Sequence, residues 1–247
     1  MPRPLMAYFG QHKSGSNWIH QITGKLARKA GLRYERYTRP TEFDRDLAAH
    51  VETNRVDCVS WVNAEWTLVK DVEFKAFHVV RDPRDILVSA YFSHLKTHPT
   101  ENWPRLAEFR PKLQAVSKEE GIMMEFDFIR DVFRRFRDWE VGDPRVIQFR
   151  LEDISQDYIS HFRQAYEFIG LFDRGLKDRH FLEVMEEMSF EKMSGGRKKG
   201  EENKDSHYRK GVHGDWQNHL TPEHIAYFKQ EHNDLLVKYG YEKDANW

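Results

Sequence analysis

The chain has 247 residues, a length that suits one sizeable domain or two small ones. Hydrophobic residues make up 39% of it and aromatic residues 14%, which is enough for a core rich in Phe and Trp. Although 32% of the residues are charged, the formal net charge is only -1, so the overall charge argues against non-specific nucleic-acid binding and any anion site must be local.

The cysteine content fits a reducing compartment, and the lack of long apolar runs indicates a soluble protein. Cys58 is the only cysteine, so no disulfide can form within the chain. The apolar run near the N-terminus is too short for a secretory signal. No apolar stretch approaches the roughly 18 residues that span a bilayer. We therefore expect a soluble, cytoplasmic protein with no membrane span.

Apolar runs and periodic segments predict strands that alternate with helices. In chain order, we expect a strand at Leu5 to Phe9, a helix at Trp18 to Ala30, a strand at Asp57 to Val62, a strand at Phe74 to Val80, a helix opened by Asp82 and Pro83, a helix at Glu119 to Trp139, a strand at Arg145 to Phe149, a helix at Tyr158 to Ile169, a polar loop at Ser194 to Asn218, and a helix from Thr221 to about Tyr239.

This alternation predicts an α/β fold in which a central parallel sheet is flanked by helices, with residues 1–247 forming a single domain. In such sheets, ligands bind outside the carboxyl ends of the strands. The segments that follow Phe9 and Val80 are both turns from a strand into a helix. We expect these two turns to lie on the same edge of the sheet.

The segment FGQHKSGSNW, Phe9 to Trp18, has the properties of a phosphate-binding loop. A helix N-terminus offers unpaired N–H groups and partial positive charge, and Gly15 allows the backbone to approach a ligand closely. Further hydrogen-bond donors come from Ser14, Ser16 and Asn17. Walker A has the form G-x-x-x-x-G-K-[ST]. Gly10 and Gly15 keep that spacing, but Lys13 precedes the second glycine, which disfavours an ordinary ATPase or GTPase.

Lys13-Ser14-Gly15-Ser16-Asn17-Trp18 resembles the K-S-G-[ST]-[TSN]-W loop of cytosolic-type sulfotransferases, which use 3′-phosphoadenosine-5′-phosphosulfate (PAPS) as sulfuryl donor. The resemblance implies a P-loop-nucleotide-kinase-like sulfotransferase fold. It also implies that the loop holds the 5′-phosphate of the donor, that Lys13 lies at the bridging oxygen, and that Trp18 flanks the adenine. A lysine in this position explains how the leaving phosphate is neutralised without the metal that kinases use.

A second motif follows the third predicted strand. Arg81 and Ser89, eight residues apart, resemble the pair with which the family holds the 3′-phosphate of the donor. The planar fork of arginine suits bidentate phosphate binding. From the residues alone, Arg81 could equally pair with Asp82 or Asp85.

Two later segments complete the resemblance. Arg209-Lys210-Gly211-Val212-His213-Gly214-Asp215-Trp216 resembles the signature R-K-G-x-x-G-D-W, in which the first three residues, here Arg209, Lys210 and Gly211, close over the 3′-phosphate. Phe190, after Met188 and Ser189, resembles the segment that packs against the adenine. Taken alone, the basic loop could be merely solvated, and Phe190 could be a core residue.

The implied reaction transfers a sulfuryl group from PAPS to a hydroxyl or amine of a small-molecule or glycan acceptor, releasing adenosine 3′,5′-bisphosphate (PAP) and needing no metal. An acceptor hydroxyl needs a general base. The family often supplies a His in a K-T-H run after an early strand, but this chain has Ser60-Trp61-Val62-Asn63 there. His12 is the first candidate base, with Glu65, His94 and His213 as alternatives, and His78 is expected to be buried and hydrogen-bonded.

Other departures from the family pattern leave several questions open. Leu151 replaces the tyrosine of the family's Y-E-D run, which puts one hydrogen bond to the donor in doubt. Of the family's dimer signature only Thr221 survives, so the oligomeric state stays open. Phe92 to Met124 could cover an apolar acceptor pocket or form a lid with a core face. The alternatives to a sulfotransferase are a nucleotide-dependent phosphotransferase and a non-catalytic nucleotide-binding protein.

Overall fold

A computed structural model describes residues 3–198, 200–201 and 212–247. Its centre is a five-stranded sheet in the order β2-β3-β1-β4-β5, and every neighbouring pair is parallel. The strands are β1 (Leu5–Gly10), β2 (Tyr34–Tyr37), β3 (Cys58–Val62), β4 (Phe74–Val80) and β5 (Val146–Arg150). The predicted α/β fold with a parallel sheet is therefore confirmed.

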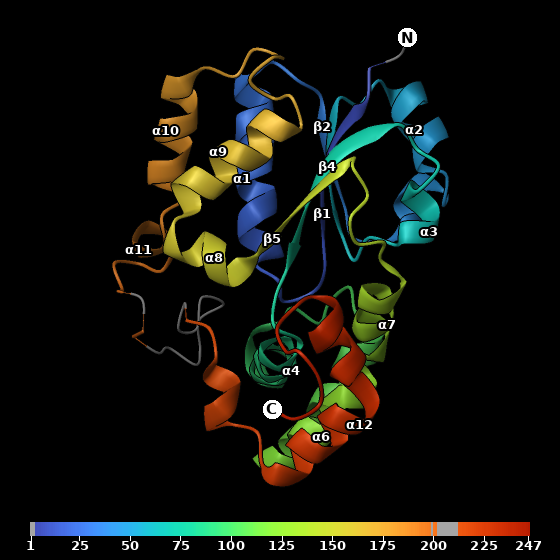
Figure 1. The fold of residues 1–247 in the computed structure, drawn as a ribbon, viewed down its shortest axis with the longest axis vertical. Helices are drawn as coiled ribbons and strands as arrows, with labels where there is room; N and C mark the ends of the chain where they lie inside the picture. Colours follow the sequence, from blue (N-terminus) through green and yellow to red (C-terminus); the bar gives the residue numbers. More distant parts are fainter. Residues whose placement is uncertain (1–2, 199, 202–211) are drawn as a thin grey trace.

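Helices connect the strands and continue beyond the last one (Figure 1). Up to β4 they are α1 (Ser16–Lys29), the 3-10 helix η1 (Pro40–Phe43), α2 (Leu47–Asn54) and α3 (Trp66–Val69). Between β4 and β5 they are α4 (Pro83–Phe92), the π-helical turn η2 (Ser93–Thr97), α5 (Pro104–Gln114), α6 (Lys118–Phe128) and α7 (Arg130–Asp138). After β5 they are α8 (Leu151–Gln156), α9 (Tyr158–Phe168), α10 (Asp178–Glu187), α11 (Phe190–Met193), the 3-10 helix η3 (Asp215–Asn218) and α12 (Pro222–Lys238).

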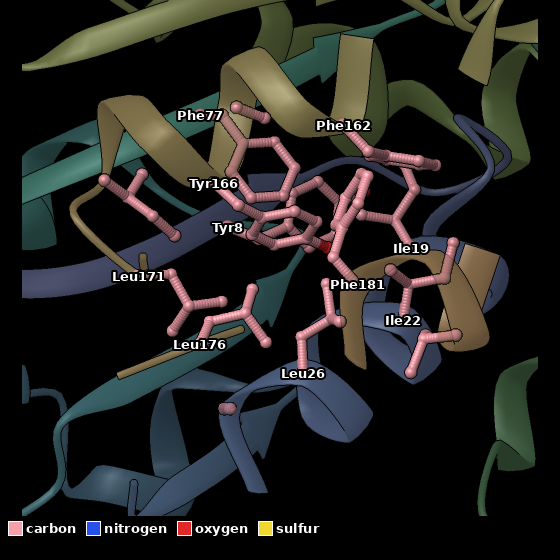
Figure 2. Packing of buried hydrophobic residues seen from close by; sticks show 14 of the residues in the cluster. Tyr8, Ile19, Ile22, Leu26, Phe77, Phe162, Tyr166, Leu171, Leu176 and Phe181 are labelled. Carbon is pink, nitrogen blue, oxygen red and sulfur yellow. The ribbon is translucent and has the colours of Figure 1, made fainter. Parts of the chain in front are cut away.

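Alternation along the strands separates two cores. Met6 and Tyr8 of β1 point to the face that α1, α9 and α10 cover, and Figure 2 shows these helices contributing large apolar side chains around Tyr8 and Phe77. Leu5, Ala7 and Phe9 belong to the cluster on the opposite face, which α2 and α3 cover. Since both faces of the sheet are buried, the three central strands β1, β3 and β4 consist mostly of apolar residues.

A third core lies below the carboxyl edge of the sheet, where α4, α6, α7 and α12 pack together (Figure 1). The sequence predicted one helix from Glu119 to Trp139, and this prediction was wrong in one respect. The backbone leaves helical geometry at Ile129, with φ -100° and ψ 15°, so α6 and α7 are separate helices. The break lets Phe126 and Phe133 both remain buried although their helices run in different directions.

The sequence also missed β2 and the turn η3. β2 is an edge strand of four residues with charged side chains in its middle, so it lacks the apolar run that marked the other strands. The segment 194–218 was expected to be a loop throughout, but its last four residues form η3. None of the helices in the described parts of the chain is long and apolar enough to cross a membrane.

The strand register aligns the segments that carry the motifs. Gly10 at the end of β1 pairs with Val62 of β3 on one side and Val79 of β4 on the other. The chain moves from β1 to one side of the sheet and later crosses β1 to reach β4, so β1 marks the point where the strand order reverses. Such a point opens a crevice at the carboxyl ends of the strands.

Candidate active site at the carboxyl edge of the sheet

A cavity of about 870 Å³ opens at this edge, a volume typical of small-molecule sites. Most of the residues predicted from the sequence line it, namely His12, Lys13, Gly15, Ser16, Asn17, Trp18, Arg81, Ser89 and Phe190. Ser14 does not line the cavity. Its side chain is buried, and the hydroxyl has no hydrogen-bond partner within the described residues. Arg209, Lys210 and Gly211 lie outside the described residues.

The loop after β1 is held by the loop after β3. The backbone N–H of Asn63 donates to the carbonyl of Gly10 at 2.8 Å, and the N–H of His12 donates to Oδ1 of Asn63 at 3.1 Å. Lys13 and Gly15 both have positive φ, 64° and 73°, and this turn brings the chain to the start of α1. The first N–H groups of α1 therefore face the cavity rather than another strand.

Leu151 packs closely over Gly15. A Cβ added at Gly15 would lie 2.8 Å from Cδ1 of Leu151. The positive φ favours glycine at this position, and an added Cβ would also force the end of the Leu151 side chain to shift. Leu151 also lines the cavity and presents no hydroxyl to it, unlike a tyrosine at the same place.

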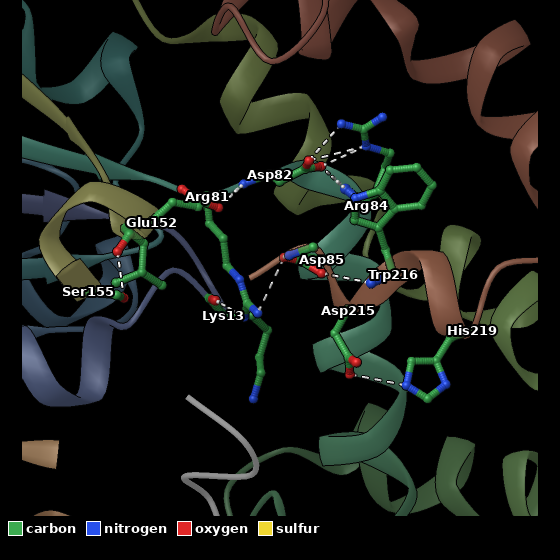
Figure 3. A network of polar contacts seen from close by, with 12 residues as sticks. Lys13, Arg81, Asp82, Arg84, Asp85, Glu152, Ser155, Asp215, Trp216 and His219 are labelled. Atoms are coloured by element: carbon green, nitrogen blue, oxygen red, sulfur yellow. Dashed lines mark hydrogen bonds and ion pairs between the residues drawn. The ribbon is translucent and has the colours of Figure 1, made fainter. Parts of the chain in front are cut away.

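Arg81 links the first two motifs (Figure 3). Its Nη1 donates to the carbonyl of Lys13 at 3.1 Å, while its Nη2 lies 4.0 Å from Oδ2 of Asp85. The pairing with Asp85 that the sequence left open is therefore a long one. The guanidinium remains at the cavity wall beside Lys13 and Ser89, where it can bind an anion.

Asp85 ties the late segment to the same place. Its side chain is 1% exposed, and its two oxygens accept the backbone N–H groups of Gly214 at 2.7 Å and Trp216 at 3.0 Å (Figure 3). Val212 and His213 line the cavity just before this anchor. The described part of the third motif thus meets the turn after β4, although more than 120 residues separate them in the sequence.

Arg84 supports the contact between the turn after β4 and the segment Gly214 to Trp216. It is buried, pairs with Asp82 at 2.8 Å and Glu242 at 2.7 Å, and its guanidinium lies 4.1 Å from the ring centre of Trp216. Trp247 lies against the same guanidinium at 4.5 Å. Buried arginine is stable only with such paired carboxylates and ring faces.

Aromatic side chains line the part of the cavity around Trp18. Nε1 of Trp18 donates to the carbonyl of Met188 at 2.7 Å, and its ring packs edge-on against Phe162 at 5.1 Å. This contact fixes one face of Trp18 and leaves it lining the cavity together with Phe190 and Tyr158. A flat, apolar group such as a purine fits between walls of this kind.

A row of three titratable side chains ends at the cavity. Nε2 of His12 lies 3.1 Å from Nε2 of His94, and Nδ1 of His94 lies 2.6 Å from Oε1 of Glu125. His94 is carried on the π-helical turn η2 and Glu125 on α6, and both are 0% exposed. π-helical turns occur frequently at functional sites. His12 is partly exposed and lines the cavity next to Lys13.

Burial disfavours charge on both inner members of this row. Burial and, to a smaller extent, the positive charge of Lys13 lower the pKa of His94 to about 2. Burial also raises the pKa of the Glu125 carboxyl well above its usual range, an effect that Lys13 partly offsets. The uncharged imidazole and a carboxyl with high proton affinity are joined by a short hydrogen bond, so the two titrate as one unit.

The remaining histidine and carboxylate candidates are not part of the row formed by His12, His94 and Glu125. Glu65 does not line the cavity and lies between Arg45 at 3.7 Å and Arg135 at 3.8 Å. His213 lines the cavity and is exposed. His78 is buried, as expected, and its Nδ1 lies 3.3 Å from Oε1 of Gln148. Across the described residues, no group of three or more His, Cys, Asp or Glu side chains is placed to hold a metal ion.

Glu125 is one of the site residues that the sequence analysis did not identify. It lies in the segment predicted as one long amphipathic helix, whose apolar residues were assigned to the core. One indication was available, because Glu125 follows Ile122 by three residues and precedes Ile129 by four, which places a carboxylate on the buried face of a helix. A carboxylate in such a position needs a partner.

Comparison with known proteins gives one family. The family model described as "Sulfotransferase domain" matches residues 8–239. Among curated proteins, Cytosolic sulfotransferase 17 of Arabidopsis thaliana is 24% identical over 165 residues, which are 62% of this chain and 46% of that protein. Cytosolic sulfotransferase 3 of the same plant is 26% identical over 166 residues, which are 63% of this chain and 51% of that protein. The matched region thus spans about half the length of these relatives.

Solved structures share the fold. A mouse sulfotransferase, SULT7A1, complexed with PAP has a TM-score of 0.61 and 19% identity, with 98% of this chain and 86% of that chain covered. A retinol dehydratase in a complex with retinol and PAP has a TM-score of 0.55 and 17% identity, with 96% and 82% covered. At these identities the likeness concerns the arrangement of helices and strands.

Proposed function

Because the chain belongs to the sulfotransferase family, we propose that it transfers a sulfuryl group from PAPS to a hydroxyl or amine of an acceptor and releases PAP. The main support for the proposal is that residues from three segments, far apart in the sequence, line the same cavity. Lys13 after β1, Ser89 on α4, and Val212 and His213 of the late segment all line one cavity. The PAP named in the related structures supports the choice of co-substrate.

The scope of the proposal follows from the same comparisons. We propose that the chain is a single sulfotransferase domain, since one family model spans residues 8–239. The relatives are named cytosolic sulfotransferases, which supports a cytoplasmic location. Retinol and androsterone, named in complexes of a related retinol dehydratase, support a small-molecule acceptor over a glycan.

The residues of the donor half fit the proposed co-substrate. Main-chain N–H groups at the start of α1, with Ser16 and Asn17, would hold the 5′-phosphate, and Arg81 with Ser89 would hold the 3′-phosphate. Trp18 and Phe190 would contact the adenine. When bound, PAPS would supply the sulfuryl group, and the negative charge would remain on the former bridging oxygen of the departing PAP. Arg209, Lys210 and Gly211 are proposed to close over the 3′-phosphate from outside the described part of the chain.

Lys13 is proposed to stabilise the departing phosphate. Its ammonium stands at the cavity wall, and its backbone carbonyl is fixed by Arg81. A preorganised cation in a site of low water content stabilises developing negative charge more than the same cation in water. The lysine thereby takes the place that a bridging metal has in kinases.

His12 is proposed as the general base, with His94 and Glu125 as positioning residues. If Nδ1 of His94 donates to Glu125, Nε2 of His94 can accept from Nε2 of His12, and Nδ1 of His12 then carries a basic lone pair. A proton taken up at Nδ1 can be matched by a shift of the Nε2 proton toward His94. The high proton affinity of Glu125 favours that shift.

Ligand binding and transfer assays test the function. A thermal shift with PAP that ATP and magnesium do not reproduce is expected, together with transfer of labelled sulfate from PAPS to at least one member of an acceptor panel. Binding of PAP without transfer would instead support a nucleotide-binding protein. Preference for ATP with magnesium would favour a phosphotransferase.

A further inference from the structure

Beyond His12, the cavity has a second half that the donor residues do not use. Its inner wall is aromatic, since the ring of Trp103 lies 5.8 Å from that of His12 and 5.5 Å from that of Phe128. Ile129 and Val132 continue this wall along the start of α7. The surface next to the proposed base is therefore apolar, as expected for a site that receives the body of an organic acceptor.

Arginine side chains surround this apolar wall. Arg39 follows β2 and donates to the backbone carbonyl of Asn102, next to Trp103. Arg105, at the start of α5, holds its guanidinium 4.4 Å from the ring centre of Phe128. Both arginines are exposed and both line the cavity, so their charged groups are available to a ligand.

Arg135 of α7 contributes a third cation to the lining of the cavity. It lines the cavity, and its Nε is buried without a hydrogen-bond partner among the described residues, with Oε1 of Glu65 3.8 Å away. Burial lowers its pKa, which indicates that its charge is poorly solvated. Glu65 also faces Arg45, so its one negative charge is shared between two arginines.

The charge of this half is strongly unbalanced. Arg36, three residues before Arg39, also lines the cavity, and no hydrogen bond or ion pair joins its side chain to another described residue. Of the acidic residues among the described lining, Glu152 accepts from Asp82 and Tyr241 at the donor end, which leaves Asp131 on the acceptor side. Several arginines thus face one carboxylate across an apolar wall.

We propose that the acceptor is an anion, an organic molecule with an apolar body, a hydroxyl or amine that reaches His12, and a carboxylate or phosphate that the arginines bind. The proposal rests on the sulfotransferase function proposed above. Arginine forks match the geometry of these anionic groups. An uncharged acceptor would gain only the apolar wall. It would leave Arg39 and Arg105 without a carboxylate partner among the described residues, and Arg135 with only its share of Glu65.

The test uses matched acceptors on two scaffolds, a phenol and a cyclohexanol, each carrying a propanoate, its methyl ester, a phosphonate or an amine. Binding to the PAP-loaded protein is measured by calorimetry, and sulfuryl transfer by labelled PAPS. The propanoate or the phosphonate is expected to exceed the ester by about tenfold in affinity and in kcat/KM, and raising the salt concentration should reduce the advantage.

The variant Arg39→Gln/Arg105→Gln should lose about tenfold for the anionic member, change little for the ester, and keep the Kd for PAP. Both positions are exposed, so folding should be retained. Arg130→Gln is the matched control, because Arg130 lies at the start of α7 but does not line the cavity.

The outcomes separate the two proposals. If PAP binds but no anionic compound exceeds its ester in binding or transfer, the inference of an anionic acceptor is wrong and the proposed function stands. A preference for the amine would also overturn the inference. If PAP itself fails to bind, the proposed function falls first.

Discussion

Lys13 combines backbone strain with a proposed catalytic charge. Its φ of 64° lies in the left-handed region, which costs an L-residue about 1–2 kcal/mol. Strain of this kind persists where the surroundings fix the conformation, as Asn63 and Arg81 do on either side of this loop.

For this reason Lys13→Gly is expected to raise the free energy of unfolding by about 1 kcal/mol while lowering kcat about 10²- to 10³-fold. Lys13→Ala should lower kcat by a similar factor without the gain in stability, and both variants should keep most of the affinity for PAP. Urea denaturation and single-turnover transfer measure the two effects. Full activity in either variant would refute the proposed role of the ammonium group.

The pH dependence of transfer examines the row of His12, His94 and Glu125. Because burial raises the pKa of Glu125, the row holds an additional proton at low pH and can accept one from the acceptor only at higher pH. We expect kcat/KM to rise with pH through an apparent pKa well above the usual range of a carboxyl group.

Glu125→Gln should lower kcat by about 10- to 100-fold and shift or remove that pH dependence, while KM for PAPS stays unchanged. Glu120→Gln, on the exposed side of the same helix, is the matched control. An unchanged pH profile in Glu125→Gln would show that the residue serves only to fill the core.

At the scale of elements, the contact between α4 and the segment that begins at Val212 brings the motifs together. Asp85 accepts hydrogen bonds from Gly214 and Trp216 and is buried. Its removal leaves two backbone N–H groups without acceptors and frees the residues that precede them.

We therefore expect Asp85→Ala to weaken PAP binding by about tenfold and the binding of adenosine 5′-phosphate by much less, since only PAP carries the 3′-phosphate. Calorimetry with the two nucleotides measures the difference. Equal losses for both would mean that Asp85 supports the whole fold rather than the 3′-phosphate site.

The elements also show what the sequence could reveal. Buried strands such as β1 and β4 were predictable because both faces of the sheet are covered, so nearly every side chain is apolar. The loop from Lys13 to Trp18 and the pair Arg81 and Ser89 were recognisable through their resemblance to the family's motifs, because their spacing alone would not have shown that Ser89 lines the cavity. β2 and the break at Ile129 were not, since neither leaves a periodic pattern.

The sequence indicated that the two strand-to-helix turns share an edge of the sheet, but not which side chains of distant segments contact each other. The hydrogen bond between His94 and Glu125 joins a π-helical turn to a helix that follows it by about 20 residues. No pattern in either segment predicts that these two side chains are partners. The same holds for Arg39 and Arg105, which come together only because β2 and α5 flank one cavity. Single residues were therefore predicted better than their partners.

For the whole molecule, buried histidines should determine acid sensitivity. Burial lowers the pKa of His78 to about 3, and its ring is stacked on Trp139 at 4.3 Å. In the unfolded chain this group takes up a proton near pH 6.5, whereas the folded chain resists until about pH 3. Stability contributed by the neutral imidazole is therefore complete above pH 6.5 and decreases as the pH falls.

His78→Gln should reduce the loss of unfolding free energy between pH 6.5 and pH 4.5 by roughly 1 kcal/mol per pH unit. Burial also lowers the pKa of His20 and His232 to about 4, so part of the slope should remain. Denaturant titrations at several pH values measure it. Identical slopes for the variant and the parent chain would assign acid sensitivity to other groups.

The arginines around the acceptor half also bear on how a turnover ends. Sulfation adds negative charge to the acceptor, so Arg39 and Arg105 would hold the sulfated molecule more tightly than the one that entered. PAP would depart from a neighbouring wall that is itself cationic. Product release rather than sulfuryl transfer would then limit kcat at low ionic strength. Moderate salt would therefore raise kcat, although it would lower the affinity for the acceptor.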